Sequence, residues 1–186
     1  MRTTRWVLSS IIVLSLFTTL PLFNEDVDAE CLRQMELILK REPEMAAVIG
    51  EPISATPVVP SRRYWQGVKE LCEQYGALLI FDEIIEGFGR TGKMFTFENF
   101  SVTPDMVVIG KGLGGGIFPL AAIIAHEELD VAADRALGHY THEKSPVACA
   151  AALATIDIVD TSGASFSSDW ASYGPFDISA GAGSTV

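Results

Sequence analysis

The sequence predicts an α/β domain in which a mostly parallel sheet carries helices on both faces. Between residues 30 and 160, short and continuous apolar runs alternate with helical stripes, as expected for strands buried on both sides. Hydrophobic residues make up 48% of the 186 residues, which is enough for one core. Several apolar runs end in a charged residue or in glycine, where a parallel sheet places its ligands.

The predicted elements follow in order along the chain. Apolar residues at helical spacing predict a first helix over residues 31–41. Ser61 is a suitable N-cap and Gly76 a suitable C-terminal stop for a second helix between them. Strands are predicted over residues 46–50, 77–81, 106–109 and 120–125, and an alanine-rich helix over 147–159.

Two flanking segments differ from this pattern, so we expect three parts: residues 1–29, 30–160 and 161–186. Arg2 and Arg5 precede an apolar run over 6–23, and small residues at 27–29 complete the order of a secretory signal. That run also approaches the length of a membrane span, so it could act as an anchor. A misjoined or truncated gene explains it equally well. The last part is rich in Ser and Gly and is predicted to be a disordered or misjoined tail.

Charge and cysteine content exclude several classes of function. The formal charge of −11 argues against a nucleic-acid surface. The three cysteines are far apart and in no CxxC spacing, so we expect buried thiols in a reducing compartment rather than disulfides or a zinc site. His139, His142 and Glu143 lack the zincin order and a clear third ligand, so we predict a polar loop and no metal.

Two charged residues are expected at the carboxyl ends of strands, where parallel sheets bind ligands. Asp82 ends the run 77–81, and Lys111 follows the run 106–109. Lys111 lies in a glycine-rich stretch, residues 110–116, so a flat ligand could approach the backbone closely. A partly desolvated lysine is nucleophilic. On position alone, a solvated loop lysine remains the alternative.

Residues 87–93 partly match both a dinucleotide fingerprint and a P-loop. The next residue is Met94 rather than the Ser or Thr that would hold magnesium. The Asp-Glu strand precedes the loop, and residues 95–100 show neither a cap nor a helical stripe. We therefore do not expect ATP or NAD binding.

Several motifs in this order resemble class-III pyridoxal-phosphate-dependent aminotransferases of the ornithine and acetylornithine type. They are Leu79-Ile80-Phe81-Asp82-Glu83, Gly87-Phe88-Gly89-Arg90-Thr91-Gly92, Thr103-Pro104-Asp105, Gly110-Lys111 with its glycines, residues 146–153, and Glu51-Pro52 upstream. The resemblance covers residues 30–160 and implies part of the fold-type-I large domain. Family members are about twice as long, and we see no counterpart of their amino-terminal phosphate loop or of their carboxy-terminal small domain.

The resemblance implies specific roles. Lys111 would form the Schiff base with pyridoxal 5′-phosphate and later move a proton, and Asp82 would pair with the ring nitrogen. Ile84 would lie against the ring face, and Thr141 would reach the cofactor phosphate of a partner subunit, which implies a homodimer. Glu51 would support the substrate pocket. The implied substrates are an amino acid or amine and a 2-oxo acid.

Departures from the family pattern leave alternatives open. Ile85 stands where the family commonly has Gln, residues 54–57 replace a Gly- and Glu-rich loop, and residues 142–144 replace Phe-Gly-Gly. These changes suggest a divergent pocket, so a lyase or an epimerase of the same fold is an alternative to a transaminase. A catalytically inactive fragment is another. The family resemblance favours a cytoplasmic location, whereas a true signal at 1–29 would imply secretion or anchoring.

Overall fold

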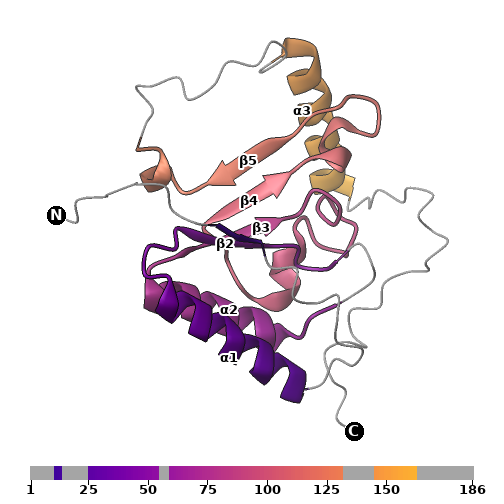
Figure 1. Cartoon of the computed structure of the whole chain (residues 1–186). Helices are drawn as coiled ribbons and strands as arrows, with labels where there is room; N and C mark the ends of the chain where they lie inside the picture. The colour runs from indigo at the N-terminus through magenta and orange to yellow at the C-terminus, as the bar shows by residue number, and fades with distance from the viewer. Residues whose placement is uncertain (1–10, 14–24, 55–58, 132–144, 163–186) are drawn as a thin grey trace, which may run out of the picture.

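A computed structural model describes residues 11–13, 25–54, 59–131 and 145–162 of the chain (Figure 1). The described elements are β1 (Ile11–Val13), α1 (Glu25–Arg41), β2 (Ala47–Gly50), α2 (Arg62–Tyr75), β3 (Leu78–Asp82), the 3₁₀ turn η2 (Thr96–Phe100), β4 (Met106–Ile109), the 3₁₀ turn η3 (Lys111–Gly114), β5 (Ala122–Ala125), the 3₁₀ turn η4 (Glu127–Leu129) and α3 (Pro146–Ser162). Strands and helices alternate from β1 to β3, and 3₁₀ turns rather than α-helices separate β3, β4 and β5. The predicted α/β class with a mostly parallel sheet is confirmed.

The five strands form one sheet in the order β1-β2-β3-β4-β5. Strands β1 to β4 are parallel, and β5 runs antiparallel to β4. The register places Gly50, Phe81 and Val107 in one row across the sheet. The carboxyl ends of β2, β3 and β4 therefore meet at one edge, which we call the ligand edge.

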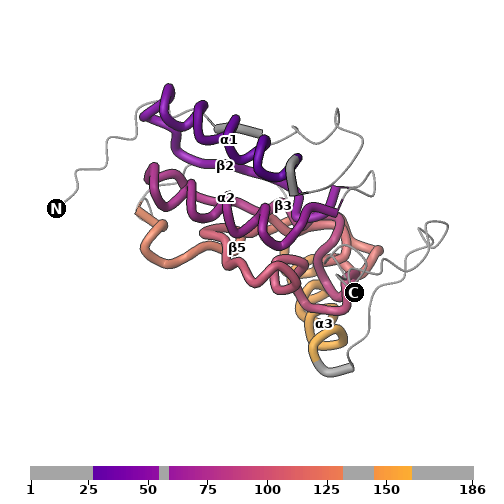
Figure 2. The backbone as a smooth tube through the Cα atoms, turned by 90° about the horizontal axis from the view of Figure 1, so that it is seen from below, coloured from indigo at the N-terminus to yellow at the C-terminus, as the bar shows by residue number. Residues whose placement is uncertain are grey.

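Helices α1 and α2 lie side by side against one face of the sheet (Figures 1 and 2). Their core is built around Trp65, which is fully buried and meets Phe81 edge-on with ring centroids 4.7 Å apart. The Trp65 indole N–H also donates to the carbonyl oxygen of Pro52 at 3.0 Å. This bond holds the chain just after Glu51, and so it fixes one side of the ligand edge.

The predicted caps of α2 are confirmed. The Ser61 side chain accepts a hydrogen bond from the backbone N–H of Tyr64 at 3.0 Å. Gly76 ends the helix in the left-handed region with φ 72°, where glycine has no steric penalty. With its two ends fixed by these caps, α2 leads directly into β3.

The observed element boundaries differ from the predicted ones where the apolar pattern of the sequence is weak. Helix α1 begins at Glu25, six residues before the predicted start at residue 31, because its first turns are acidic and carry few apolar residues. Val27 nevertheless packs against the core, and the Ser61 hydroxyl donates to the carboxylate of Asp28.

The two flanking segments are described only in part. Residues 11–13 form β1, which pairs in parallel with Ala47, Val48 and Ile49 of β2. The carboxy-terminal part is described only to Ser162, the last residue of α3. No helix in the described ranges is long and apolar enough to cross a membrane. The signal-like and tail-like assignments of the remaining flanking residues lie outside the described residues and stay predictions.

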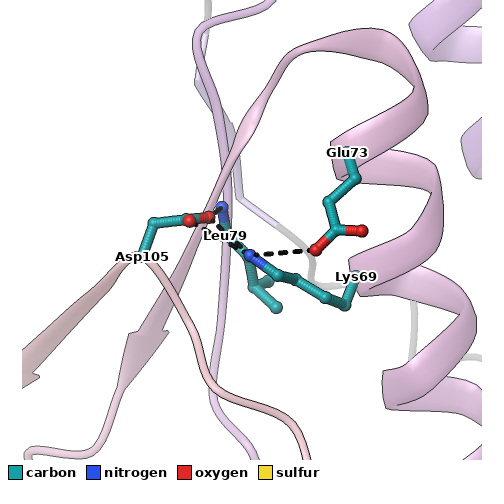
Figure 3. Close-up of polar contacts among 4 residues, drawn as sticks. All are labelled: Lys69, Glu73, Leu79 and Asp105. Carbon is teal, nitrogen blue, oxygen red and sulfur yellow. Dashed lines mark hydrogen bonds and ion pairs between the residues drawn. The ribbon is translucent and has the colours of Figure 1, made fainter. Parts of the chain in front are cut away.

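Asp105 ties the start of β4 to β3 and to α2 (Figure 3). Its carboxylate accepts from the backbone N–H of Leu79 at 2.7 Å and from Lys69 Nζ at 3.0 Å and 3.2 Å. Its own N–H donates to the Leu79 carbonyl oxygen at 2.8 Å. Lys69 also lies 3.6 Å from the exposed carboxylate of Glu73. Asp105 therefore sets the position of β4, and with it the position of Lys111.

We expect Asp105→Ala to lower the free energy of unfolding by about 1–3 kcal/mol, because it leaves the Leu79 N–H without its acceptor. Urea denaturation followed by circular dichroism measures this loss. The matched control is Glu73→Ala, which removes only an exposed ion pair and should cost less than about 1 kcal/mol. Equal losses in both variants would contradict the structural role of Asp105.

Candidate functional site

Three of the predicted site residues lie at the ligand edge. Glu51 directly follows β2, Asp82 is the last residue of β3, and Lys111 is the first residue of η3, two positions after β4 ends. Because β2, β3 and β4 are neighbouring parallel strands, the backbone positions of these residues lie side by side. Thr141 lies outside the described residues, and so do His139, His142 and Glu143.

Asp82 is half-buried and turned away from the face that α1 and α2 cover. Leu79 and Phe81 of the same strand are buried under those helices, and side chains alternate along a strand. One carboxylate oxygen of Asp82 accepts from the backbone N–H of Ile84 at 3.1 Å. This local bond orients the carboxylate and starts the turn that leaves the strand.

Ile84 connects Asp82 with the Lys111 segment. Its N–H binds Asp82, while its side chain lies against Gly110, the residue before Lys111. A Cβ added to Gly110 would lie 3.4 Å from Ile84 Cγ2, so the glycine allows this close approach. The structure therefore brings Asp82, Ile84 and the backbone next to Lys111 together.

Lys111 has a constrained backbone and an accessible side chain. Its φ is 39°, in the left-handed region that non-glycine residues rarely adopt. The residue is exposed, and within the described residues its amine has no ion pair or hydrogen bond. Phe88, itself at φ 61°, packs against Gly112 and lies in one apolar cluster with Leu113 and Ile109. A turn with a constrained backbone thus places Lys111, with its exposed side chain, at the ligand edge.

Glu83 is a structural residue whose role the sequence did not reveal. It is completely buried, and its two carboxylate oxygens accept from the backbone N–H groups of Thr96 at 2.7 Å and Phe97 at 2.8 Å. Its carbonyl oxygen accepts from Gly87 N–H at 3.0 Å. Burial raises the pKa of Glu83 to about 7, although the two backbone donors oppose this rise. Glu83 therefore anchors the loop that carries Ile84.

Glu86 is the second residue that the sequence did not single out. It is 6% exposed, and neither carboxyl oxygen has a hydrogen-bond partner from another described residue. Burial, assisted by the nearby carboxylates of Glu51, Glu83 and Asp82, raises the pKa of Glu86 to about 9. The side chain therefore carries a proton at neutral pH. The burial of residues 86–89 after the end of β3 would have pointed to Glu86, but that burial can be seen only in the folded structure.

The loop over residues 87–93 uses its own backbone donors internally. Phe88 N–H donates to the Met94 carbonyl oxygen at 2.8 Å, Gly89 N–H to that of Lys93 at 3.1 Å, and Gly92 N–H to that of Gly89 at 3.0 Å. These three N–H groups are thus not available to hold a phosphate, as they would be in a P-loop. The sequence predicted no helix after this loop, and the element that follows is only the short 3₁₀ turn η2.

The chemistry of these residues fits the cofactor that the resemblance implies. An accessible amine, a carboxylate on the neighbouring strand end and an aliphatic side chain between them can hold an aldehyde-bearing aromatic ring. The close packing of Ile84 on Gly110 supports this fit, because it places the aliphatic surface next to the amine-bearing residue. No group of three His, Cys, Asp or Glu able to hold a metal is present in the described ranges.

Sequence comparison finds relatives of this chain. The family model for aminotransferase class-III matches residues 8–169. A curated relative, the (R)-1-hydroxy-2-aminoethylphosphonate ammonia-lyase of Vibrio splendidus (strain 12B01), is 45% identical over 127 residues. That match covers 68% of this chain and 26% of the relative, so this chain spans about a quarter of that protein.

Several solved transaminases have a similar fold. An (S)-enantioselective omega-transaminase from Thermomicrobium roseum is 38% identical with a TM-score of 0.70, covering 76% of this chain and 34% of that one. An amine transaminase from an uncultivated Pseudomonas species, in its pyridoxal-phosphate-bound form, is 34% identical with a TM-score of 0.68, at 74% and 34% coverage. The ornithine delta-aminotransferase of Plasmodium falciparum is 32% identical with a TM-score of 0.65, at 69% and 34% coverage.

The raised pKa of Glu86 makes the stability of the fold depend on pH. The folded value of about 9 lies above the ordinary 4.5, so between these values the folded state binds a proton that the unfolded state has released. The free energy of unfolding must then fall as pH rises, by at most about 1.4 kcal/mol per pH unit for one proton. Between pH 7 and pH 9 the main contribution comes from Glu86, because Glu83 titrates near pH 7.

We therefore expect Glu86→Gln, which keeps the neutral shape, to flatten the loss of stability between pH 7 and pH 9. Chemical denaturation at several pH values measures the slope. The matched control is Glu70→Gln, the same change at an exposed carboxylate, which should leave the slope unchanged. The burial of an unpaired Glu86 would be disproved if both variants kept the wild-type slope.

Proposed function

Because this chain belongs to the class-III aminotransferase family, we propose that it forms the cofactor-binding part of a pyridoxal-phosphate-dependent transaminase. The reaction would transfer an amino group between an amino acid or amine and a 2-oxo acid. One observation carries the proposal: Ile84 binds Asp82 through its N–H and packs on Gly110, next to Lys111. Since this chain spans about a third of the solved transaminases, the whole protein's activity is part of the proposal.

When bound, pyridoxal phosphate supplies an aldehyde that condenses with primary amines and a ring that accepts electrons from the substrate Cα. Lys111 would hold the cofactor through its amine and then carry a proton to and from the substrate carbon. Asp82 would hold a proton on the ring nitrogen, because a carboxylate beside that nitrogen favours its charged form. Ile84 would orient the ring by packing on its face.

Two further residues complete the proposed site. Glu51 follows β2 at the ligand edge and would contact the substrate. Thr141 would bind the cofactor phosphate of a partner subunit, so we propose that the active protein is a homodimer. A protonated Glu86 would add no negative charge beside Asp82 at neutral pH.

A second candidate reaction is the elimination of ammonia. The observation that favours it is the 45% identity to an ammonia-lyase over 127 residues. Ile85, in the loop after Asp82, departs from the Gln common in transaminases and is consistent with a changed pocket. The two reactions differ in their products, because a lyase releases free ammonia without a 2-oxo acid acceptor.

We also propose a cytoplasmic location, on the strength of the family resemblance. Cys31, Cys72 and Cys149 are free thiols, and the first two are buried, which suits a reducing compartment. Cell fractionation of the full chain and of a variant that lacks residues 6–23 would test whether this segment acts as an anchor or a signal.

The binding proposal predicts that added pyridoxal phosphate gives the purified protein an absorbance band near the edge of the visible range. Borohydride reduction should fix the cofactor to the protein, and peptide mass spectrometry should locate it at Lys111. Lys111→Ala should lose both signals, whereas Lys93→Ala, at an exposed lysine of the neighbouring loop, should keep them.

Asp82→Asn should keep the covalent attachment and shift the band, because the ring nitrogen loses the carboxylate that keeps it protonated. An unchanged fold with no band in the wild-type protein would identify a catalytically inactive fragment. Labelling at Lys93 instead of Lys111 would also contradict the proposal.

A further inference from the structure

Glu86 is enclosed where a charged carboxylate has no stabilising contact. Both of its carboxyl oxygens are inaccessible to water, and neither has a hydrogen-bond partner in the part of the chain that the structure describes. Because water does not reach these oxygens, an atom of another segment or chain does not reach them either unless the loop around them moves. The charges that act most strongly on Glu86 come from Glu51 after β2 and from Asp82 and Glu83 at the end of β3, and all three are acidic. The neutral acid is therefore the form that suits this place.

Glu83 shows what a charged carboxylate needs in the same loop. It is also completely buried, but its oxygens accept from the backbone N–H groups of Thr96 at 2.7 Å and Phe97 at 2.8 Å. These two donors favour the ionised form of Glu83, whereas Glu86 has no such donor from another residue in the described ranges. A rise in pH can therefore ionise Glu83 within the closed loop, but it ionises Glu86 far more readily once the loop has opened to water.

Hydrogen bonds link residues 86–88 to both sides of their loop. They join Gly87 N–H to the Glu83 carbonyl oxygen at 3.0 Å, Phe88 N–H to that of Met94 at 2.8 Å, and the Thr96 hydroxyl to that of Glu86 at 3.1 Å. The core cluster under helices α1 and α2 contains none of residues 86–88. Breaking these few bonds therefore opens the segment at a lower cost than unfolding the whole domain.

Phe88 connects this segment with the turn that carries Lys111. A Cβ added to Gly112 would lie 3.5 Å from Phe88 Cβ, and Phe88 shares its apolar cluster with Leu113. The Leu113 N–H closes the turn by donating to the Gly110 carbonyl oxygen at 3.0 Å. Lys111 lies inside this turn at φ 39°, a strained conformation that depends on the packing around it. When the segment leaves its place, the turn loses the ring that it packs against.

We propose that ionisation of Glu86 opens residues 86–88 locally and releases the turn that carries Lys111. The neutral acid keeps the turn in place, and the charged carboxylate lets it relax. The open loop exposes Glu86 to water, where its pKa has the ordinary value of 4.5, against about 9 in the closed loop. Between these values the closed loop holds a proton that the open loop has released. The population of the open loop must therefore rise with pH, by at most about tenfold per pH unit.

The opening would regulate the proposed cofactor site. Lys111 is the residue that we propose to hold pyridoxal phosphate, so this consequence rests on the proposed function. The opening itself does not, because it depends only on Glu86 and on the packing of Phe88 against the Lys111 turn.

Quenched-flow hydrogen exchange of the full chain without cofactor, read by NMR between pH 7 and pH 10, tests the opening. After correction for the intrinsic exchange rate, protection of the Phe88 and Leu113 amides should fall together, by up to about tenfold per pH unit. The fall should level off above about pH 9, where the closed loop has lost its proton as well. The Leu79 amide, which donates to Asp105, reports on global unfolding and should stay better protected than both at every pH.

Glu86→Gln keeps the shape of the side chain without its titration, so protection of Phe88 and Leu113 should no longer fall with pH. The matched control, Glu70→Gln, changes an exposed carboxylate of α2 and should keep the wild-type profile. A wild-type profile that is flat between pH 7 and pH 9 would overturn the proposal. So would a fall at Phe88 without one at Leu113, because the turn would then be independent of the loop. Equal protection of Leu79 and Phe88 would also overturn it, because Glu86 would then ionise only in the unfolded chain.

A second measurement separates the opening from the proposed function. Borohydride attachment of pyridoxal phosphate at Lys111 should decline in the wild type between pH 8 and pH 10, whereas Glu86→Gln should retain it. Equal declines in both proteins would overturn the regulation of the site by Glu86. No attachment at any pH would contradict the proposed function, and the exchange profiles of the cofactor-free chain would still decide whether the loop opens.

Discussion

The candidate site depends on the buried carboxyl group of Glu83, which fixes the loop after β3 to the end of that strand. Its two oxygens take the backbone N–H groups of Thr96 and Phe97, and its carbonyl takes that of Gly87, so both ends of a long loop are fixed to one strand end. Because side chains alternate along an extended chain, burying Glu83 turns Asp82 to the opposite side. One carboxyl of the Asp-Glu pair therefore serves the fold, and this leaves the other available for chemistry.

The loop that Glu83 anchors also packs against the turn that carries Lys111. Phe88 and Lys111 both have positive φ, a strained conformation for residues with side chains. The surrounding packing sustains this strain, because Phe88 lies in the apolar cluster with Leu113 under η3. Lys111 in such a turn has few backbone alternatives, so the point from which its flexible side chain starts is fixed. Asp105 contributes from the other end of β4, where it fixes the register of the strand that leads to Lys111.

Much of this arrangement was predictable from the sequence, because the signals are local. Alternating apolar runs gave the strands, and Ser61 and Gly76 gave the ends of α2. The placement of Asp82 and Lys111 at one edge followed from the rule that parallel strands end together. The environment of Glu86 was not predictable, because it is formed by the ends of β2 and β3, far apart along the chain. Helix α1 began earlier than expected for a similar reason: Val27 gains its packing only from the folded core.

The carboxyl groups at the ligand edge also limit which ligands suit it. Glu51, Asp82 and Glu83 are the charges that act on Glu86, and all of them are acidic. A region of this kind can lower its free energy in two ways: it can take up a proton, as Glu86 does, or it can bind a ligand that brings positive charge. In the proposed function, a protonated ring nitrogen beside Asp82 and a substrate ammonium beside Glu51 would both meet the second condition. The acidic neighbours of Glu86 are thus in keeping with the proposed amine chemistry.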